Sequence, residues 1–166
     1  LNAAVLVAAE IAGVDAIYQV GGVPAIGAMA YGTDSIPKVD KICGPGNIFV
    51  TVAKREVYGH VDIDGLYGPT ETVVIADDST DPILAAADLL AQAEHDEMAS
   101  PILITTDGAT AQRISDEINR QLTSLERGPV AAAAIAAQGV AVVVDSVERA
   151  LELANGYAPE HLCLLV

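Results

Sequence analysis

The segment Glu71-Thr-Val-Val-Ile-Ala76 carries the strongest strand signal in the chain, because β-branched and apolar residues follow one another without a break. The next segment, Asp78-Ser-Thr-Asp-Pro82, predicts the start of a helix, with proline near the first helical position. Apolar residues continue at helical spacing to about His95, and residues 101–105 predict a second strand. A strand, a helix and a strand in this order predict a parallel β-α-β unit with a right-handed crossover.

The same alternation extends toward both ends of the chain. Helices are predicted over residues 2–13, 23–31, 47–58, 109–125, 129–138 and 146–155, and strands over 15–20, 41–43, 140–144 and from 161. In the helix over 82–95, the apolar side chains expected on one face are those of Ile83, Leu84, Ala87, Leu90 and Ala91. The predicted fold class is α/β, with incomplete Rossmann-like parallel sheets covered by helices.

After Val61 the sequence pattern changes, because a segment with Gly65 and Gly68-Pro69 leads into the strong strand signal of residues 71–76. This change predicts a boundary between two units near residues 65–69. The first unit is expected to comprise residues 1–67 and the second residues 68–166, each as part of a Rossmann-like unit. The chain begins without a Met inside a predicted helix and stops inside a predicted strand. We therefore expect it to be an internal piece of a longer protein.

Composition narrows the classes of partner. The 166 residues are 52% hydrophobic, and 23 acidic against 8 basic side chains give a formal charge of −15. Such a surface repels nucleic acid and anionic membranes, and no apolar run approaches the roughly 20 residues that a membrane-spanning helix needs. We expect a cytoplasmic protein. Cys43 and Cys163 are far apart and lack metal-ligand spacing, so both are interpreted as ordinary buried thiols.

Two glycine-rich junctions are candidate ligand sites, because ligands of open α/β sheets gather where strands end and helices begin. Val20-Gly-Gly-Val-Pro-Ala25 is either an anion site built from backbone N–H groups or a tight turn. In Gly44-Pro-Gly-Asn47, the Asn47 amide either contacts a nucleotide or caps the following helix. Neither stretch has the six-position Rossmann glycine fingerprint.

Three further junctions carry side chains suited to chemistry on a polar substrate. Thr70 follows a Gly-Pro turn, where its hydroxyl either holds a substrate or makes a turn hydrogen bond. Gln92 and His95 are three residues apart near a helix end, where they either ligate a cation such as zinc or form a solvated terminus. Glu160 and His161 stand side by side before a strand and suit proton removal from an alcohol.

Taken together and in order, these segments resemble the histidinol dehydrogenase family, whose members are longer than this chain. The matching motifs are Gly21-Gly-Val-Pro-Ala-Ile-Gly-Ala-Met-Ala-Tyr-Gly-Thr33, Val39-Asp-Lys-Ile-Cys-Gly-Pro-Gly-Asn-Ile-Phe-Val50, Gly68-Pro-Thr-Glu71, Gln92-Ala-Glu-His95 and Pro159-Glu-His-Leu162. The resemblance implies an NAD-dependent and zinc-dependent oxidoreductase of histidine biosynthesis. It would take L-histidinol to L-histidine through the aldehyde in two hydride transfers.

The resemblance also implies a role for each matching residue. Asn47 would contact NAD, Thr70 would bind substrate, and Gln92 and His95 would bind both zinc and substrate. Glu160 and His161 would be the acid–base couple, with His161 also touching substrate. The two other zinc ligands of the family, an Asp and a His, would lie beyond Val166, so we expect the isolated chain to be inactive. Apolar surface that the missing parts of the protein would cover is expected to cause self-association, as a homodimer or otherwise.

Two positions depart from the family pattern. Pro24 stands where the family usually has a Gln that contacts NAD, and Tyr67 stands where a small Ala usually precedes the Gly-Pro turn. These departures leave two alternatives to a histidinol dehydrogenase. One is a related dehydrogenase of another small polar alcohol, such as a sulfonated diol. The other is a non-catalytic α/β binding or scaffold domain.

Overall fold

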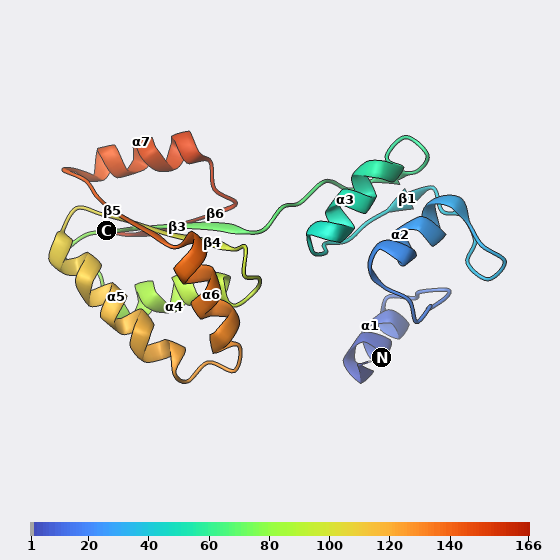
Figure 1. Cartoon of the computed structure of the whole chain (residues 1–166), viewed down its shortest axis with the longest axis horizontal. Helices are drawn as coiled ribbons and strands as arrows, with labels where there is room; N and C mark the ends of the chain where they lie inside the picture. The colour runs from blue at the N-terminus through green and yellow to red at the C-terminus, as the bar shows by residue number, and fades with distance from the viewer. Residues whose placement is uncertain (1) are drawn as a thin grey trace. The chain divides into compact units, whose positions relative to one another are not determined.

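The computed structural model describes residues 2–166, which form two compact units. The first unit ends at Gly68, and the second comprises Pro69–Val166. Each unit has its own parallel strands and its own buried clusters. The predicted α/β class, with parallel sheets covered by helices, is confirmed (Figure 1).

The second unit is built on a four-stranded parallel sheet. Its strands are β3 (Glu71–Ala76), β4 (Ser100–Thr105), β5 (Val140–Val143) and β6 (His161–Leu165), in the order β5-β4-β3-β6. Five of the six residues of β3 are buried, as expected for a central parallel strand covered on both faces. The chain therefore moves from β3 to β4 to β5 and then returns to the other side of β3.

Helices cover both faces of this sheet (Figure 1). On one face lie α4 (Pro82–Ala93), α5 (Gly108–Leu122) and α6 (Gly128–Gln138), and on the other lies α7 (Val147–Tyr157). Alternate residues of β3 point to opposite faces, so Val74 packs against α4 and α5 while Val73 packs against α7. The crossing from β5 to β6 over the α7 face makes the sheet doubly wound.

Helix α4 buries a different face from the one predicted. Its buried residues are Ala85, Ala86, Leu89, Leu90 and Ala93. Of the predicted face only Leu90 is buried, whereas Ile83 and Leu84 are 52% and 59% exposed. The alanines place no bulk between the helix and its neighbours, so α4 can lie close to the sheet on that side.

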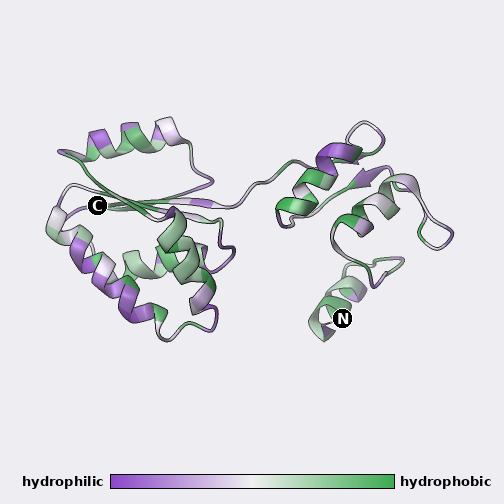
Figure 2. Ribbon diagram, in the orientation of Figure 1, coloured by the Kyte–Doolittle hydropathy of each residue, from purple (hydrophilic) through white to green (hydrophobic). Residues whose placement is uncertain are grey.

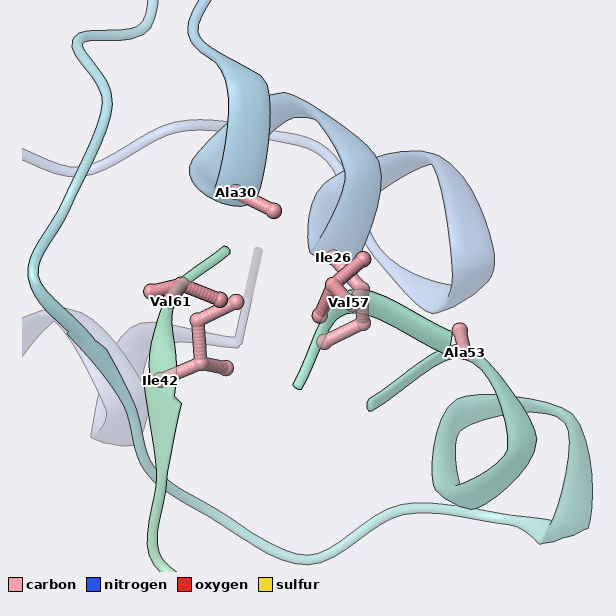
Figure 3. Close-up of a cluster of buried hydrophobic side chains, with 6 residues drawn as sticks. All are labelled: Ile26, Ala30, Ile42, Ala53, Val57 and Val61. Carbon is pink, nitrogen blue, oxygen red and sulfur yellow. The ribbon is translucent and has the colours of Figure 1, made fainter. Parts of the chain in front are cut away.

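The first unit contains three helices and a short two-stranded parallel sheet. The helices are α1 (Ala3–Ile11), α2 (Gly22–Tyr31) and α3 (Ile48–Val57), and the strands are β1 (Lys41–Ile42) and β2 (Asp62–Ile63). Figure 3 shows the small core, in which side chains of α2 and α3 meet those of Ile42 and Val61. Figure 2 shows a mixed hydropathy along α3, whose hydrophilic second half holds Lys54, Arg55 and Glu56.

Two further sequence predictions are wrong. Residues 15–20 form no strand, because a strand needs a hydrogen-bonding neighbour and all six residues are exposed, without a ladder partner in the described part of the chain. Cys43 is exposed rather than buried, whereas Cys163 is partly buried. Helix α4, predicted to run to about His95, ends at Ala93, so His95 lies just after the C-cap residue Glu94. Within residues 2–166, no helix is long and apolar enough to cross a membrane.

Candidate functional site

Three of the predicted site residues lie at the amino edge of the four-stranded sheet. Thr70 directly precedes β3, and Glu160 and His161 stand at the start of β6. Thr72 pairs with His161 across the β3–β6 ladder, and neighbouring strands are about 4.8 Å apart, so this edge brings Thr70 and the Glu-His pair to adjacent strands. Thr70 is also fixed toward β4, because its carbonyl accepts the Ser100 N–H at 3.0 Å.

The other two predicted residues reach the same edge from helix α4. In a parallel β-α-β unit the helix runs back to the amino end of the next strand, and Gln92 and His95 lie between the last turn of α4 and β4. The expected place for a ligand was the carboxyl edge, where strands end and helices begin. That expectation is wrong for these residues: Thr70 precedes β3 after a loop, and the other four lie where α4 or α7 ends and the next strand begins.

His95 is held by the backbone of the helix that precedes it. Its N–H donates to the Gln92 carbonyl at 3.1 Å, and its ring Nδ1 lies 2.8 Å from the Ala91 carbonyl oxygen. A carbonyl oxygen can only accept, so Nδ1 is the donor in this contact. In the neutral imidazole Nε2 would then be the ring atom available to a metal ion, an arrangement that is common among metal-binding histidines. Gln92 lies in the last turn of α4, and His95 lies in a turn that continues the chain just beyond the helix.

Glu160 and His161 form a loose, exposed pair. The Glu160 Oε1 and His161 Nε2 atoms are 3.7 Å apart, which is beyond a normal hydrogen bond, and both side chains are more than half exposed. They follow Ala158, which ends α7 in the left-handed conformation at φ 57° and donates its N–H to Ala154. Non-glycine residues rarely adopt this conformation, so the turn before the pair is strained.

The amino edge has a negative electrostatic character. The C-terminal ends of α4 and α7 both point to it, and such ends carry a partial negative charge. Glu94, Asp96 and Glu97 add full negative charges beside Gln92 and His95. Arg127, the N-cap residue of α6, donates to the His95 carbonyl at 3.3 Å and adds one positive charge beside this turn. The edge therefore favours a cationic ligand over an anionic one.

The glycine-rich junction of the first unit lies at a carboxyl strand edge, as predicted. Gly44 follows β1 at φ +121°, a conformation open to glycine, and Asn47 is the N-cap of α3. The Asn47 Oδ1 accepts the Val50 N–H at 3.2 Å, which bears out the capping interpretation and leaves the amide Nδ2 to donate elsewhere. Pro24 lies in the first turn of α2 and is exposed.

The sequence analysis missed a buried ion pair beside this junction. Lys54, on α3, is 2% exposed, and its ammonium group bonds the Asp64 carboxylate and the Gly44 carbonyl, the latter at 3.0 Å. The Asp64 carboxylate also accepts the N–H groups of Gly44 at 2.7 Å and Gly65 at 2.8 Å. The Gly44 N–H, then the Lys54 ammonium and last the Gly65 N–H lower the pKa of Asp64 to about 2.

A signal for this pair was present in the sequence. Val50, Ala53 and Val57 have core spacing on α3, and Lys54 falls on the same face. A charged side chain at a core position requires a partner, because an unpaired buried charge costs several kcal/mol.

Two side chains at the amino edge are of a type that could bind a metal ion. Gln92 and His95 offer an oxygen and a nitrogen donor of the kind that zinc accepts, but four ligands are normal. Within residues 2–166, no three His, Cys, Asp or Glu side chains are grouped in a way that could hold a metal ion. The donors therefore fit zinc in kind, and a complete site needs further ligands.

These features define a parallel α/β protein with acid–base and potential ligating side chains at the amino edge of its second sheet. The family described as histidinol dehydrogenase matches residues 1–166, and the chain belongs to this family. Histidinol dehydrogenase of Synechococcus sp. is 58% identical over 166 residues, and that of Lactiplantibacillus plantarum is 57% identical over 162 residues. This chain is covered to 100% and 98% in these comparisons and spans 38% of each relative.

A solved structure agrees with the sequence comparisons. The crystal structure of histidinol dehydrogenase from Elizabethkingia anophelis superposes with a TM-score of 0.92 at 45% identity, over all of this chain and 38% of that one. The fold and the family are therefore shown together.

Proposed function

We propose that this chain carries part of the active site of an NAD-dependent, zinc-dependent histidinol dehydrogenase that oxidises L-histidinol to L-histidine through the aldehyde. The observation that carries the proposal is the arrangement of Thr70, the Gln92–His95 turn and the Glu160–His161 pair along one sheet edge in a member of this family. The proposed catalytic residues are Glu160 and His161.

Each residue at the edge has a chemical task in this proposal. The Thr70 hydroxyl binds the substrate, and the Gln92–His95 turn orients it. His161 accepts the hydroxyl proton of the alcohol, and Glu160 exchanges protons in the hydration and oxidation of the aldehyde. When bound, NAD takes the hydride and zinc polarises the substrate oxygen. His95 Nε2 and the Gln92 carbonyl would hold the zinc, with further ligands from outside these 166 residues.

The electrostatics of the edge favour histidinol over a sulfonated alcohol. Histidinol carries an ammonium group at neutral pH, and two helix C-termini with three neighbouring acidic side chains stabilise a cation there. A sulfonate would meet the same groups as like charges. This supports histidinol as the substrate despite the unusual Pro24 and Tyr67.

The first unit is assigned to the cofactor and the second to the substrate and metal. Support comes from the Gly44–Asn47 junction at a carboxyl strand edge, where the Asn47 amide keeps its two N–H donors after capping α3 with its oxygen. We further propose that the protein is cytoplasmic and forms a homodimer or another self-association.

The test is NADH formation by the full-length, zinc-loaded protein that contains this chain, offered histidinol and then other small polar alcohols including a sulfonated diol. We expect turnover with histidinol, and a fall in kcat of about 10²- to 10⁴-fold for Glu160→Gln or His161→Gln. The matched control is His60→Gln, an exposed histidine of the first unit. Turnover only with another alcohol would support the related dehydrogenase, and no turnover would support a binding domain.

Zinc is tested separately by metal analysis. Removal of zinc with a chelator should abolish turnover, and added zinc should restore it. His95→Ala should lower the zinc content while His60→Ala should not. The 166-residue chain alone is expected to form no NADH, because two donors hold zinc weakly; turnover by the isolated chain would contradict this.

A further inference from the structure

The carboxyl edge of the first sheet is tied together by one buried lysine. Gly44 follows β1 and Asp64 follows β2, so the two residues extend from neighbouring parallel strands. The Gly44 N–H and carbonyl are both engaged, the first by Asp64 at 2.7 Å and the second by Lys54 at 3.0 Å. The Lys54 ammonium therefore contacts both strand ends from the helix that begins at Ile48, next to Asn47.

The side chain of Lys54 is shielded from solvent. Its side chain is 3% exposed, and its ammonium lies 5.7 Å from the centre of the Tyr67 ring. Asn47, Thr51 and Lys54 share one face of α3. Thr51 donates its hydroxyl to the Tyr67 carbonyl at 2.7 Å, so the same face that holds the Gly44–Asn47 junction also holds Tyr67.

We propose that Lys54 is a positioning residue for the cofactor, in that its bonds to Asp64 and Gly44 fix the Gly44–Asn47 junction in the shape that presents the Asn47 amide. The inference rests on the proposed function for its cofactor and on the observed contacts for its geometry. Without the ammonium group, the Gly44 carbonyl loses its donor and the Asp64 carboxylate keeps its two N–H partners. Gly44 can then sample other backbone conformations, because glycine has no Cβ atom to restrict its dihedral angles.

The first experiment measures kinetics in the full-length, zinc-loaded protein. For Lys54→Met we expect KM for NAD to rise at least about tenfold, while kcat falls less than about threefold and KM for histidinol stays within about twofold. Adding Asp64→Asn to Lys54→Met should worsen KM for NAD by no more than about twofold, because both groups act in one network. The matched control is Lys41→Met, which removes the exposed Lys41–Asp62 pair between the same two strands.

The second experiment needs neither substrate nor cofactor. Amide hydrogen exchange in this chain should speed up at least about tenfold at Gly44 in Lys54→Met and stay unchanged in Lys41→Met. If exchange at Gly44 is faster in Lys54→Met but the wild-type protein shows no turnover, the proposed function is contradicted. The role of Lys54 in fixing the shape of the junction is then still supported. Unchanged exchange at Gly44, or an unchanged KM for NAD in a folded and active Lys54→Met variant, would overturn the inference.

Discussion

Asp64 illustrates how one carboxylate can serve as an acceptor for several backbone groups. It receives the N–H groups of Gly44 and Gly65 and the ammonium of Lys54, all of which favour its ionised form. The pKa of Asp64 is about 2, against 3.8 for an unperturbed aspartate. Its contribution to stability is therefore present above the unfolded pKa and is lost as the pH falls through the folded pKa.

This sign gives a prediction for acid unfolding. Asp64→Asn should destabilise the first unit at about pH 5, and the gap to the wild type should shrink toward about pH 2, because the wild-type carboxylate becomes protonated over that range. Urea unfolding at both pH values measures the gap. The control is Asp62→Asn, whose exposed carboxylate pairs with the exposed Lys41 and accepts the Ile63 N–H. A gap of equal size at both pH values would contradict the assignment.

Among single residues, the sequence analysis identified side chains whose chemistry is recognisable from short motifs. It missed the buried lysine that pairs with Asp64. Thr70, Gln92, His95, Glu160 and His161 are predicted to lie at junctions between elements, and the structure places them there. Their roles stay predictions. Lys54 could not be paired with Asp64, since ten residues and a change of element separate them. Which edge of the sheet collects the junctions also depends on strand order, which short motifs do not contain.

Single elements show where hydrophobic periodicity is ambiguous. Helix α4 is apolar on most of its surface, so the spacing of Ile83, Leu84 and Ala87 fits a buried face as well as that of Ala85, Ala86 and Leu89. The structure buries the second set because small side chains permit close packing on the sheet. The strands 71–76 and 100–105 could be predicted, because buried parallel strands are short apolar runs between turn signals. Strand 140–143 is the same kind of run, although it is an edge strand and mostly exposed.

The end of helix α7 offers a test of local strain. Ala158 has φ 57° at the C-cap, where glycine is usual. Ala158→Gly should stabilise the second unit by about 1 kcal/mol, because glycine accepts the left-handed conformation that alanine resists. The same change at Ala132, an exposed position inside α6, should instead destabilise by about 1 kcal/mol. Urea unfolding measures both changes, and a loss of stability for Ala158→Gly would refute the strain.

Across the whole molecule, large apolar side chains remain uncovered. In the first unit, a groove of about 580 Å³ lies between α2 and α3, and Tyr31 and Phe49 on its walls are 61% and 69% exposed. Sequence analysis could predict an incomplete α/β fold, because the alternation of elements is regular. It could not predict which faces stay open, because that depends on chain segments that lie beside these residues in space rather than in sequence.

Exposed apolar surface of this size predicts self-association of the isolated chain. Light scattering should show a mean mass that rises with protein concentration. Phe49→Ser should reduce this rise, whereas Val14→Ser, which removes an exposed apolar side chain outside the groove, should have little effect. A clean monomer at high concentration would rule the association out.

The two thiols differ in a way that has a practical use. The nearby Asp88 carboxylate and partial burial raise the pKa of the Cys163 thiol to about 11. Thiolates rather than thiols react with electrophilic dyes, so Cys163 should stay unmodified near neutral pH. Cys43 is exposed and directly precedes Gly44. The unmutated chain thus offers one attachment point for a fluorophore, whose emission would report optically on ligands arriving at the neighbouring loop.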